Sequence, residues 1–294
     1  MRLLQPRQAR LGRAAVAAAA TLTLAGCGMF KSSGIGGRYE PNDPNRVAER
    51  VVAGVSNTTY FTADAPSDKA TFRATLYDKD GRQFFGPEVL LNGEAVPMVS
   101  GGDERTTVYS KTELPYAAGQ TYTLAVQGHT AATPAAPAPL KITSPAASKD
   151  DNGNTLTYFL TEPGQPVTIT WTGGDPGLPV YIILYGAPDK NGQRRLFVSD
   201  NTAMSPSDPL NFGKPIANTG TYTIPAQLTE RVPSGSGANS TRTVTPFDNP
   251  NKEGGSTNVI SISVLQRQET TSGPIRFSVA SIGTAAAGIK AYKQ

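Results

Sequence analysis

Short runs of alternating hydrophobic and polar residues fill the chain from Val47 onward, separated by clusters of Gly, Pro, Asn and Asp. Alternation with a period of two indicates half-buried β-strands, and the clusters indicate turns. The run 71–77 is the clearest case, because Phe72, Ala74 and Leu76 would share one face of a strand. The pattern predicts an all-β chain.

Two dipeptides in this region have the composition of hairpin turns. Asp80-Gly81 follows the strand predicted at 71–77, and Asn92-Gly93 lies between two further hydrophobic runs. Both dipeptides tolerate the positive φ that tight hairpin turns require. Each therefore predicts a pair of adjacent antiparallel strands.

A segment rich in Pro and Ala interrupts the alternation at 130–139. Pro cannot donate to a strand ladder and favours extended polyproline geometry, so we expect a domain boundary there. The length of 294 residues also favours two domains. The predicted organisation is a leader at 1–26, a tether at 27–46, a first β-sandwich at 47–128, a linker at 129–139, a second β-sandwich at 140–282 and a C-terminal tail at 283–294.

The segment 114–124, Leu-Pro-Tyr-Ala-Ala-Gly-Gln-Thr-Tyr-Thr-Leu, resembles the corner before a late strand of immunoglobulin and fibronectin type III sandwiches. In those folds a tyrosine hydroxyl bonds back to the backbone upstream. The resemblance implies that Tyr122 is this structural residue. The first unit is therefore expected to be an Ig-like or fibronectin III-like sandwich.

The second unit contains, in order, ITSP at 142–145, PGQPVTITW at 163–171, GTYTIP at 220–225 and SGPIRFSV at 272–279. This succession is similar to the Ig-like domain of the fungal Ser-Thr-rich wall-anchored glucan-synthesis family and its bacterial surface homologues. The resemblance implies a second Ig-like sandwich. Trp171, which shares strand parity with Val167 and Ile169, is expected to be structural and to face its core. The Gly- and Ser-rich insertion 226–257 is expected to be a long disordered loop.

The start of the chain has the composition of a secretory signal. Arg2, Arg7, Arg10 and Arg13 precede a 13-residue run of mostly apolar residues at 14–26. A helix that spans a membrane needs about 20 apolar residues, so this run is too short to remain as an anchor. The pattern predicts a leader that is removed.

Leu24-Ala25-Gly26-Cys27 resembles the lipobox of bacterial lipoproteins. The resemblance implies cleavage between Gly26 and Cys27, with lipid attached covalently to the Cys27 thiol. Several acyl chains on one residue give stable membrane attachment. Gly28 follows the cysteine, and in Gram-negative families a residue other than Asp at this position favours the outer membrane. The predicted location is therefore the cell envelope, with membrane lipid as the first partner.

Removal of the leader changes the charge of the protein. The chain has 27 basic and 23 acidic residues, and four of the arginines lie in the leader. The remaining chain is neutral, so it lacks the overall basic charge that is typical of proteins that bind nucleic acid.

Few residues suit catalysis or metal binding. His129 is the only imidazole and Cys27 the only thiol, so a zinc site with several His or Cys ligands cannot be formed within one chain. A Ser-His-Asp triad would need His129, and no Gly-x-Ser-x-Gly turn is present. We expect no cofactor beyond the lipid and no catalytic residue.

Two further features are candidates for binding. Asp78 and Asp80 resemble a fragment of a calcium loop, although a hairpin turn capped by Asp is the favoured interpretation. Tyr77, Tyr109 and Tyr185 are the aromatic residues best placed to stack against a sugar if they are exposed.

Together these patterns predict a lipid-anchored envelope protein with two tandem Ig-like sandwiches, acting as a non-catalytic binding, spacer or assembly module. Its partner would be an envelope protein or a cell-wall polysaccharide. Two alternatives stay open: a carboxylate-dependent surface glycan hydrolase, which would need two acidic residues about 5 to 9.5 Å apart, and a calcium-stabilised adhesin.

Overall fold

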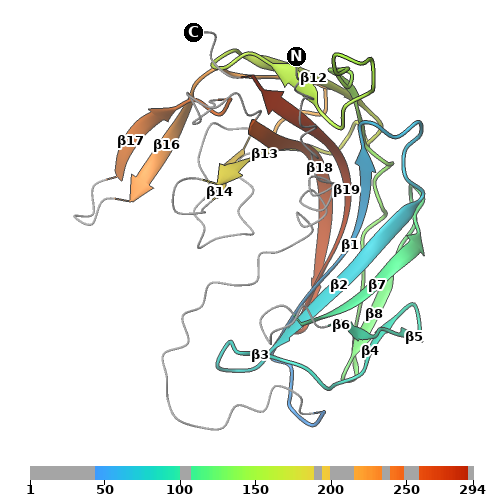
Figure 1. Ribbon diagram of the computed structural model, residues 1–294. Coiled ribbons are helices and arrows are strands. Elements are labelled where there is room, and N and C mark those ends of the chain that lie inside the picture. Colours follow the sequence, from blue (N-terminus) through green and yellow to red (C-terminus); the bar gives the residue numbers. More distant parts are fainter. Residues whose placement is uncertain are drawn as a thin grey trace, which may run out of the picture.

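The computed structural model describes residues 44–99, 107–188, 194–198, 215–233, 239–247 and 258–290. These residues form strands and turns, and none of them lies in a helix. The predicted all-β, Ig-like sandwich class is confirmed. Figure 1 shows a long curved sheet with smaller sheets packed along it.

The largest sheet has ten strands and extends along both halves of the molecule. Eight of them follow the order β14-β13-β18-β19-β1-β2-β7-β6, while β11 pairs with β19 and β3 with β2. The strands are β1 (Arg50–Tyr60), β2 (Lys69–Tyr77), β3 (Gln83–Phe84), β6 (Met98–Val99), β7 (Val108–Pro115), β11 (Phe159–Thr161), β13 (Tyr181–Pro188), β14 (Arg194–Val198), β18 (Asn258–Ser272) and β19 (Ile275–Ile289).

Three smaller sheets complete the described structure. A four-stranded sheet consists of β5 (Glu94–Ala95), β4 (Val89–Leu91), β8 (Thr123–Val126) and β9 (His129–Ala132). A three-stranded sheet consists of β10 (Lys141–Ser144), β12 (Val167–Thr172) and β15 (Thr221–Ile224). A two-stranded sheet pairs β16 (Leu228–Pro233) with β17 (Asn239–Val244).

The first core lies between the four-stranded sheet and strands β1, β2 and β19 of the large sheet. Phe72, Ala74 and Leu76 all face it, as their alternation predicts. The predicted turn at Asn92-Gly93 joins β4 to β5, with φ values of 52° and 81° that suit a two-residue hairpin. The main large side chains of this core are Phe72, Leu76, Phe84, Leu91, Tyr122, Leu124 and Phe277.

The second core lies between the three-stranded sheet and strands β13, β18 and β19. Val167, Ile169 and Trp171 of β12 point into it, in agreement with the predicted parity. From the large sheet, Ile182 and Ile262 pack against them. Each half of the molecule is therefore a sandwich of one small sheet on the large sheet.

The C-terminal hairpin joins the two sandwiches. Strands β18 and β19 pair over their full length around a turn at Gly273-Pro274. Phe277, near this turn, lies in the first core, whereas Ile289, at the other end of β19, lies in the second. The hairpin is long enough to cross both cores because 15 extended residues span about 50 Å.

This hairpin differs from the predicted division of the chain. The second sandwich is predicted at 140–282, but residues 275–279 pair with β1 of the first sandwich. The predicted tail at 283–294 instead begins inside β19, which continues to Ile289. The small residues of this segment are mostly buried, because both faces of β19 are covered there.

The predicted linker at 129–139 also differs. Residues His129–Ala132 form β9 at the edge of the four-stranded sheet, and Ala136 is buried in the first core. The Ala136 N–H donates to the Gln120 carbonyl at 2.8 Å. The prolines at 134, 137 and 139 lie outside the strand, so the segment packs on the sandwich without needing ladder bonds from them.

The insertion at 226–257, predicted as a long disordered loop, contains the β16–β17 hairpin. Leu228, the first residue of β16, and Phe247, which follows β17, are buried in the second core. Residues 234–238 and 248–257 lie outside the described residues. The prediction was wrong for these two strands because it rested on the Gly- and Ser-rich parts of the insertion, whereas the strands themselves contain Thr and Val.

The two sandwiches meet at a closely packed junction. The Leu140 N–H donates to the Ser281 hydroxyl oxygen at 2.7 Å. Gln266, which is fully buried, accepts from the Asp175 N–H at 2.6 Å, and its amide donates to the carbonyls of Asp175 and Leu178 at 2.8 and 2.9 Å. Side-chain bonds from β18 and β19 thus hold both the entry to β10 and the loop after β12.

Gly173, in that loop, has φ +83°, and a Cβ added to it would lie 1.9 Å from the Pro139 carbonyl oxygen. Only glycine permits this close approach of two backbone segments.

Candidate functional site

The large sheet has one face against the two cores and one face turned away from them. Successive residues in a strand point to opposite faces. Phe277 lies in the first core, so its neighbours Arg276 and Ser278 lie on the other face. In Figure 1 the shared strands curve, with β4, β8 and β12 on the convex side. We name the opposite side, defined by Arg73, Arg267, Glu269, Arg276 and Ser278, the concave face.

The strand register brings these residues together from distant parts of the sequence. Glu269 of β18 pairs with Ser278 of β19, which pairs with Gly54 of β1. Gly54 in turn pairs with Arg73 of β2, and Arg73 with Ser110 of β7. Residues in register lie side by side on one face. The row therefore crosses five strands, and its middle position carries no side chain.

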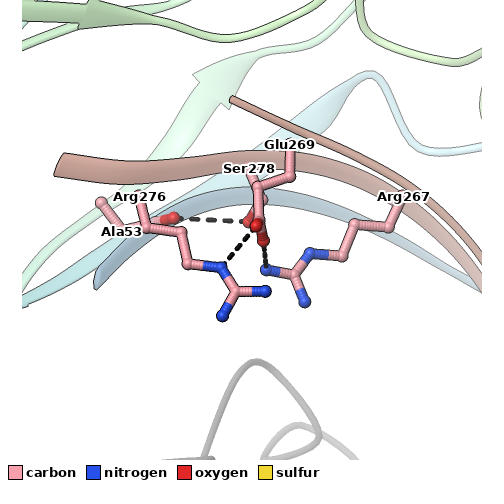
Figure 2. Close-up of polar contacts among 5 residues, drawn as sticks. All are labelled: Ala53, Arg267, Glu269, Arg276 and Ser278. Carbon is pink, nitrogen blue, oxygen red and sulfur yellow. Dashed lines mark hydrogen bonds and ion pairs between the residues drawn. The ribbon is translucent and has the colours of Figure 1, made fainter. Parts of the chain in front are cut away.

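Glu269 bridges two arginines. Its Oε2 atom accepts a hydrogen bond from Arg267 Nη2 at 2.5 Å, and its Oε1 atom accepts one from Arg276 Nε. Figure 2 shows both guanidinium groups on the same side of the sheet, with the carboxylate between them. Beneath the cluster, the Ser278 hydroxyl donates to the Ala53 carbonyl at 3.3 Å. The shared carboxylate fixes the position of both guanidiniums.

The two arginines differ in exposure. The Arg267 side chain is 9% exposed and that of Arg276 is 38% exposed. Burial lowers the pKa of Arg267, and the nearby Arg276 charge lowers it further, whereas Glu269 opposes the shift. An arginine stays protonated even so. Arg267 is therefore a buried positioning charge, and Arg276 is the one available to a partner.

The charges of the central strands are strongly one-sided. Strands β1, β2, β18 and β19 contain the basic residues Arg50, Lys69, Arg73, Arg267 and Arg276 but a single acid, Glu269. By register and parity these basic residues all belong to the concave face. These strands therefore give the concave face a local basic surface.

The predicted stacking tyrosines are not exposed platforms. Tyr109 is buried in the first core, where its hydroxyl donates to the Pro87 carbonyl at 2.7 Å. Tyr77 is buried on the concave side, with the Arg50 guanidinium 4.3 Å from its ring centre. Tyr185 is half-buried. The expectation was wrong for Tyr109 because β7 places it opposite Ala74, a core residue. It was wrong for Tyr77 because the Arg50 guanidinium lies over its ring.

The calcium candidates Asp78 and Asp80 form a capped turn. Asp78 Oδ1 accepts from the backbone N–H groups of Asp80 and Arg82 at 2.9 and 2.8 Å, and Oδ2 accepts from Arg46 at 2.5 Å. Gly81 has φ 73°. Both carboxylate oxygens of Asp78 are engaged, which matches the Asp-capped hairpin turn.

The two structural candidates lie in the two cores. The Tyr122 hydroxyl donates to the Pro115 carbonyl at 2.8 Å, the upstream bond of a tyrosine corner. Burial raises the pKa of Tyr122 to about 12. Trp171 Nε1–H donates to Asn218 Oδ1 at 2.8 Å from the second core. Each of the two side chains is buried in its apolar core and makes one hydrogen bond at the edge of that core.

Gly26 and Cys27 lie outside the described residues. His129 begins β9 with an exposed side chain. Within the ranges that the structure describes, His, Cys, Asp and Glu form no group of three or more suited to a metal ion. The same ranges hold no apolar helix of membrane-spanning length.

Sequence reasoning missed the basic cluster on the concave face. The signal was present in the Gly273-Pro274 turn, because a two-residue hairpin would place Glu269 opposite Ser278 and Arg267 opposite Ala280. In the sequence this dipeptide is interpreted only as part of the SGPIRFSV motif, so no charged residues are paired across the turn.

Comparison with known proteins adds little. No protein-family model matches the chain, and no curated protein matches it. Among solved structures, the adhesin InvE of Yersinia pseudotuberculosis aligns with 12% identity and a TM-score of 0.18, over 81% of this chain and 58% of that chain. Neither its fold nor its function is transferred to this chain.

Proposed function

We propose that this protein is exported, anchored by lipid on Cys27, and acts without catalysis as a stiff envelope module that presents the concave face to a partner. The single observation that carries the proposal is the arginine-rich leader that ends at Leu24-Ala25-Gly26-Cys27. A short apolar run with a cysteine directly after small residues is the pattern of a processed and lipidated start.

The shared hairpin supports the stiffness of this module. Two sandwiches joined by a flexible linker would move independently, but here β18 and β19 pass through both cores without interruption. The Gln266 and Ser281 bonds add further contacts at the junction. Bending the molecule there would break ladder hydrogen bonds, so the body suits a spacer.

The path of the chain gives this spacer a direction. Strand β1 starts at Arg50, beside the hairpin turn, where the Val51 N–H donates to the Pro274 carbonyl at 2.8 Å. The chain from Cys27 therefore joins the body at the end of the first sandwich that is remote from the second. A membrane anchor at Cys27 would place the second sandwich farther from the lipid.

The anchor is tested by metabolic labelling with a fatty acid. We expect the wild-type chain to incorporate label and to partition with membranes, and the Cys27→Ser variant to do neither. A matched control moves the thiol by combining Cys27→Ser with Ser32→Cys, which should also stay unlabelled because small lipobox residues no longer precede the thiol. Label in either variant, or an unlabelled wild-type chain that retains residues 1–26, would contradict the proposal.

A further inference from the structure

We propose that the concave face binds a carboxylated polysaccharide through Arg73 and Arg276, with Arg267 and Glu269 as positioning residues. The inference deepens the proposed function, because it names the class of partner that the envelope module would hold. It rests on charge, on an unmade hydrogen bond and on the position of the residues within the sheet.

The charge of this face points to an anionic ligand. Five basic residues and one acid occupy the four central strands. Glu269 already accepts from both Arg267 and Arg276, so one carboxylate serves two guanidiniums. Like charges gathered on one surface repel each other, and an added anion relieves that repulsion. The face is therefore complementary to a carboxylate, which guanidinium binds with two parallel hydrogen bonds.

Arg73 has a hydrogen-bond donor without an acceptor. Its Nε atom is buried and has no hydrogen-bond partner among the described residues. A buried donor without an acceptor is unusual in a folded protein. Arg73 and Ser278 lie on either side of Gly54, so no side chain separates them in this row. A carboxylate bound beside Arg73 would accept a hydrogen bond from its Nε–H.

The position within the sheet favours a polysaccharide over an acidic peptide. Peptides commonly bind a sheet by adding a strand at its edge, where backbone groups are free. Strands β1 and β19 are central, so their backbone groups are occupied by the ladder and a ligand must be recognised through side chains. The face offers guanidinium groups in the middle of the sheet, where a chain of acidic sugars can lie across several strands. The carboxylates and hydroxyls of such a chain match guanidinium donors.

The test uses the mature chain from residue 27 to 294 with Cys27→Ser, so that binding is measured in solution and does not depend on the anchor. The probe is polygalacturonate, with neutral dextran and poly-glutamate as comparisons. We expect binding to polygalacturonate that weakens as salt rises, no binding to dextran, and weaker binding to poly-glutamate. Equal affinity for poly-glutamate would overturn the assignment to a polysaccharide.

Substitutions then locate the site. Arg73→Gln and Arg276→Gln should each weaken binding about tenfold, the usual effect of losing one charge-assisted hydrogen bond. Arg82→Gln, in the exposed turn after β2, is the matched control and should leave binding unchanged. Circular dichroism melting checks that each variant is folded. Absence of polygalacturonate binding, or an equal loss in the Arg82 variant, would overturn the proposal while leaving the labelling test of Cys27 intact.

Discussion

The two sandwiches share one large sheet, yet the buried aromatic side chains of each make hydrogen bonds of a different kind. In the first, three buried tyrosine hydroxyls donate to proline carbonyls: Tyr109 to Pro87, Tyr116 to Pro137 and Tyr122 to Pro115, at 2.7 to 2.8 Å. In the second, the Trp171 indole donates to Asn218. A phenol titrates and an indole does not. The comparison shows that these side-chain hydrogen bonds are specific to each sandwich, whereas the strands β18 and β19 are common to both.

The largest effect is expected from a core residue on the shared strand. Phe277→Ala removes a fully buried ring that packs edge-to-face on Phe72, with ring centroids 6.1 Å apart. A Phe→Ala change in a core costs about 3 to 5 kcal/mol. Urea unfolding followed by circular dichroism measures the loss.

The matched control is Arg276→Ala, one residue earlier on the opposite face. Its ion pair with Glu269 is partly exposed, so we expect a loss below about 1 kcal/mol. Equal losses for Phe277 and Arg276 would contradict the assignment of the two faces.

A smaller effect is expected at the junction. Gln266→Leu keeps most of the side-chain volume but removes the acceptor of the Asp175 N–H and the side-chain donor to the Leu178 carbonyl, while the Asp175 carbonyl still accepts from Asn218 at 3.2 Å. Leaving a buried polar group unsatisfied costs about 1 to 3 kcal/mol. The control is Gln268→Leu, whose amide makes one exposed bond to the Ala135 carbonyl, and a smaller loss is expected there. If both variants unfold at the same urea concentration, Gln266 does not hold the junction.

The smallest effect at neutral pH is expected for Tyr122→Phe, which removes one hydrogen bond and costs about 0.5 to 1.5 kcal/mol. Its clearer signature lies at high pH. The pKa of Tyr122 is raised to about 12, whereas an unfolded tyrosine titrates near about 10. The folded state therefore retains the proton longer, and this contribution to stability is lost as pH rises from about 10 to 12.

Burial also raises the pKa of Tyr116, so the Tyr122→Phe variant should show a shallower alkaline loss and not a flat one. Unfolding free energies measured across this pH range, for wild type and variant, provide the comparison. An unchanged slope would mean that Tyr122 does not titrate differently in the folded state.

The strands next to tight turns could be predicted from the sequence because their signals are local. Asn92-Gly93 and the alternation at 71–77 needed no information from elsewhere in the chain. The division into units could not be predicted in the same way, because the pairing of β1 with β19 joins residues more than 200 positions apart. The small residues at 285–288 gave no sign of their burial.

The same reasoning explains the candidate site. Cys27 is recognised from four consecutive residues, so sequence alone is enough to propose it. The basic cluster needs two strand registers before Arg73 and Arg276 share a face, and no local pattern contains that information. Hydrophobic periodicity identifies the core side of a strand more readily than it identifies which charges meet on the other side.

The central claim, that both sandwiches depend on one shared hairpin, is tested most directly with Trp171, the only tryptophan in the chain. Its fluorescence reports on the second core, while Phe277 lies in the first. In the Phe277→Ala variant, the account predicts that the urea midpoint of Trp171 fluorescence falls together with that of circular dichroism, in one cooperative transition. A Trp171 midpoint equal to that of wild type, beside a biphasic circular dichroism curve, would show two independent domains and contradict it.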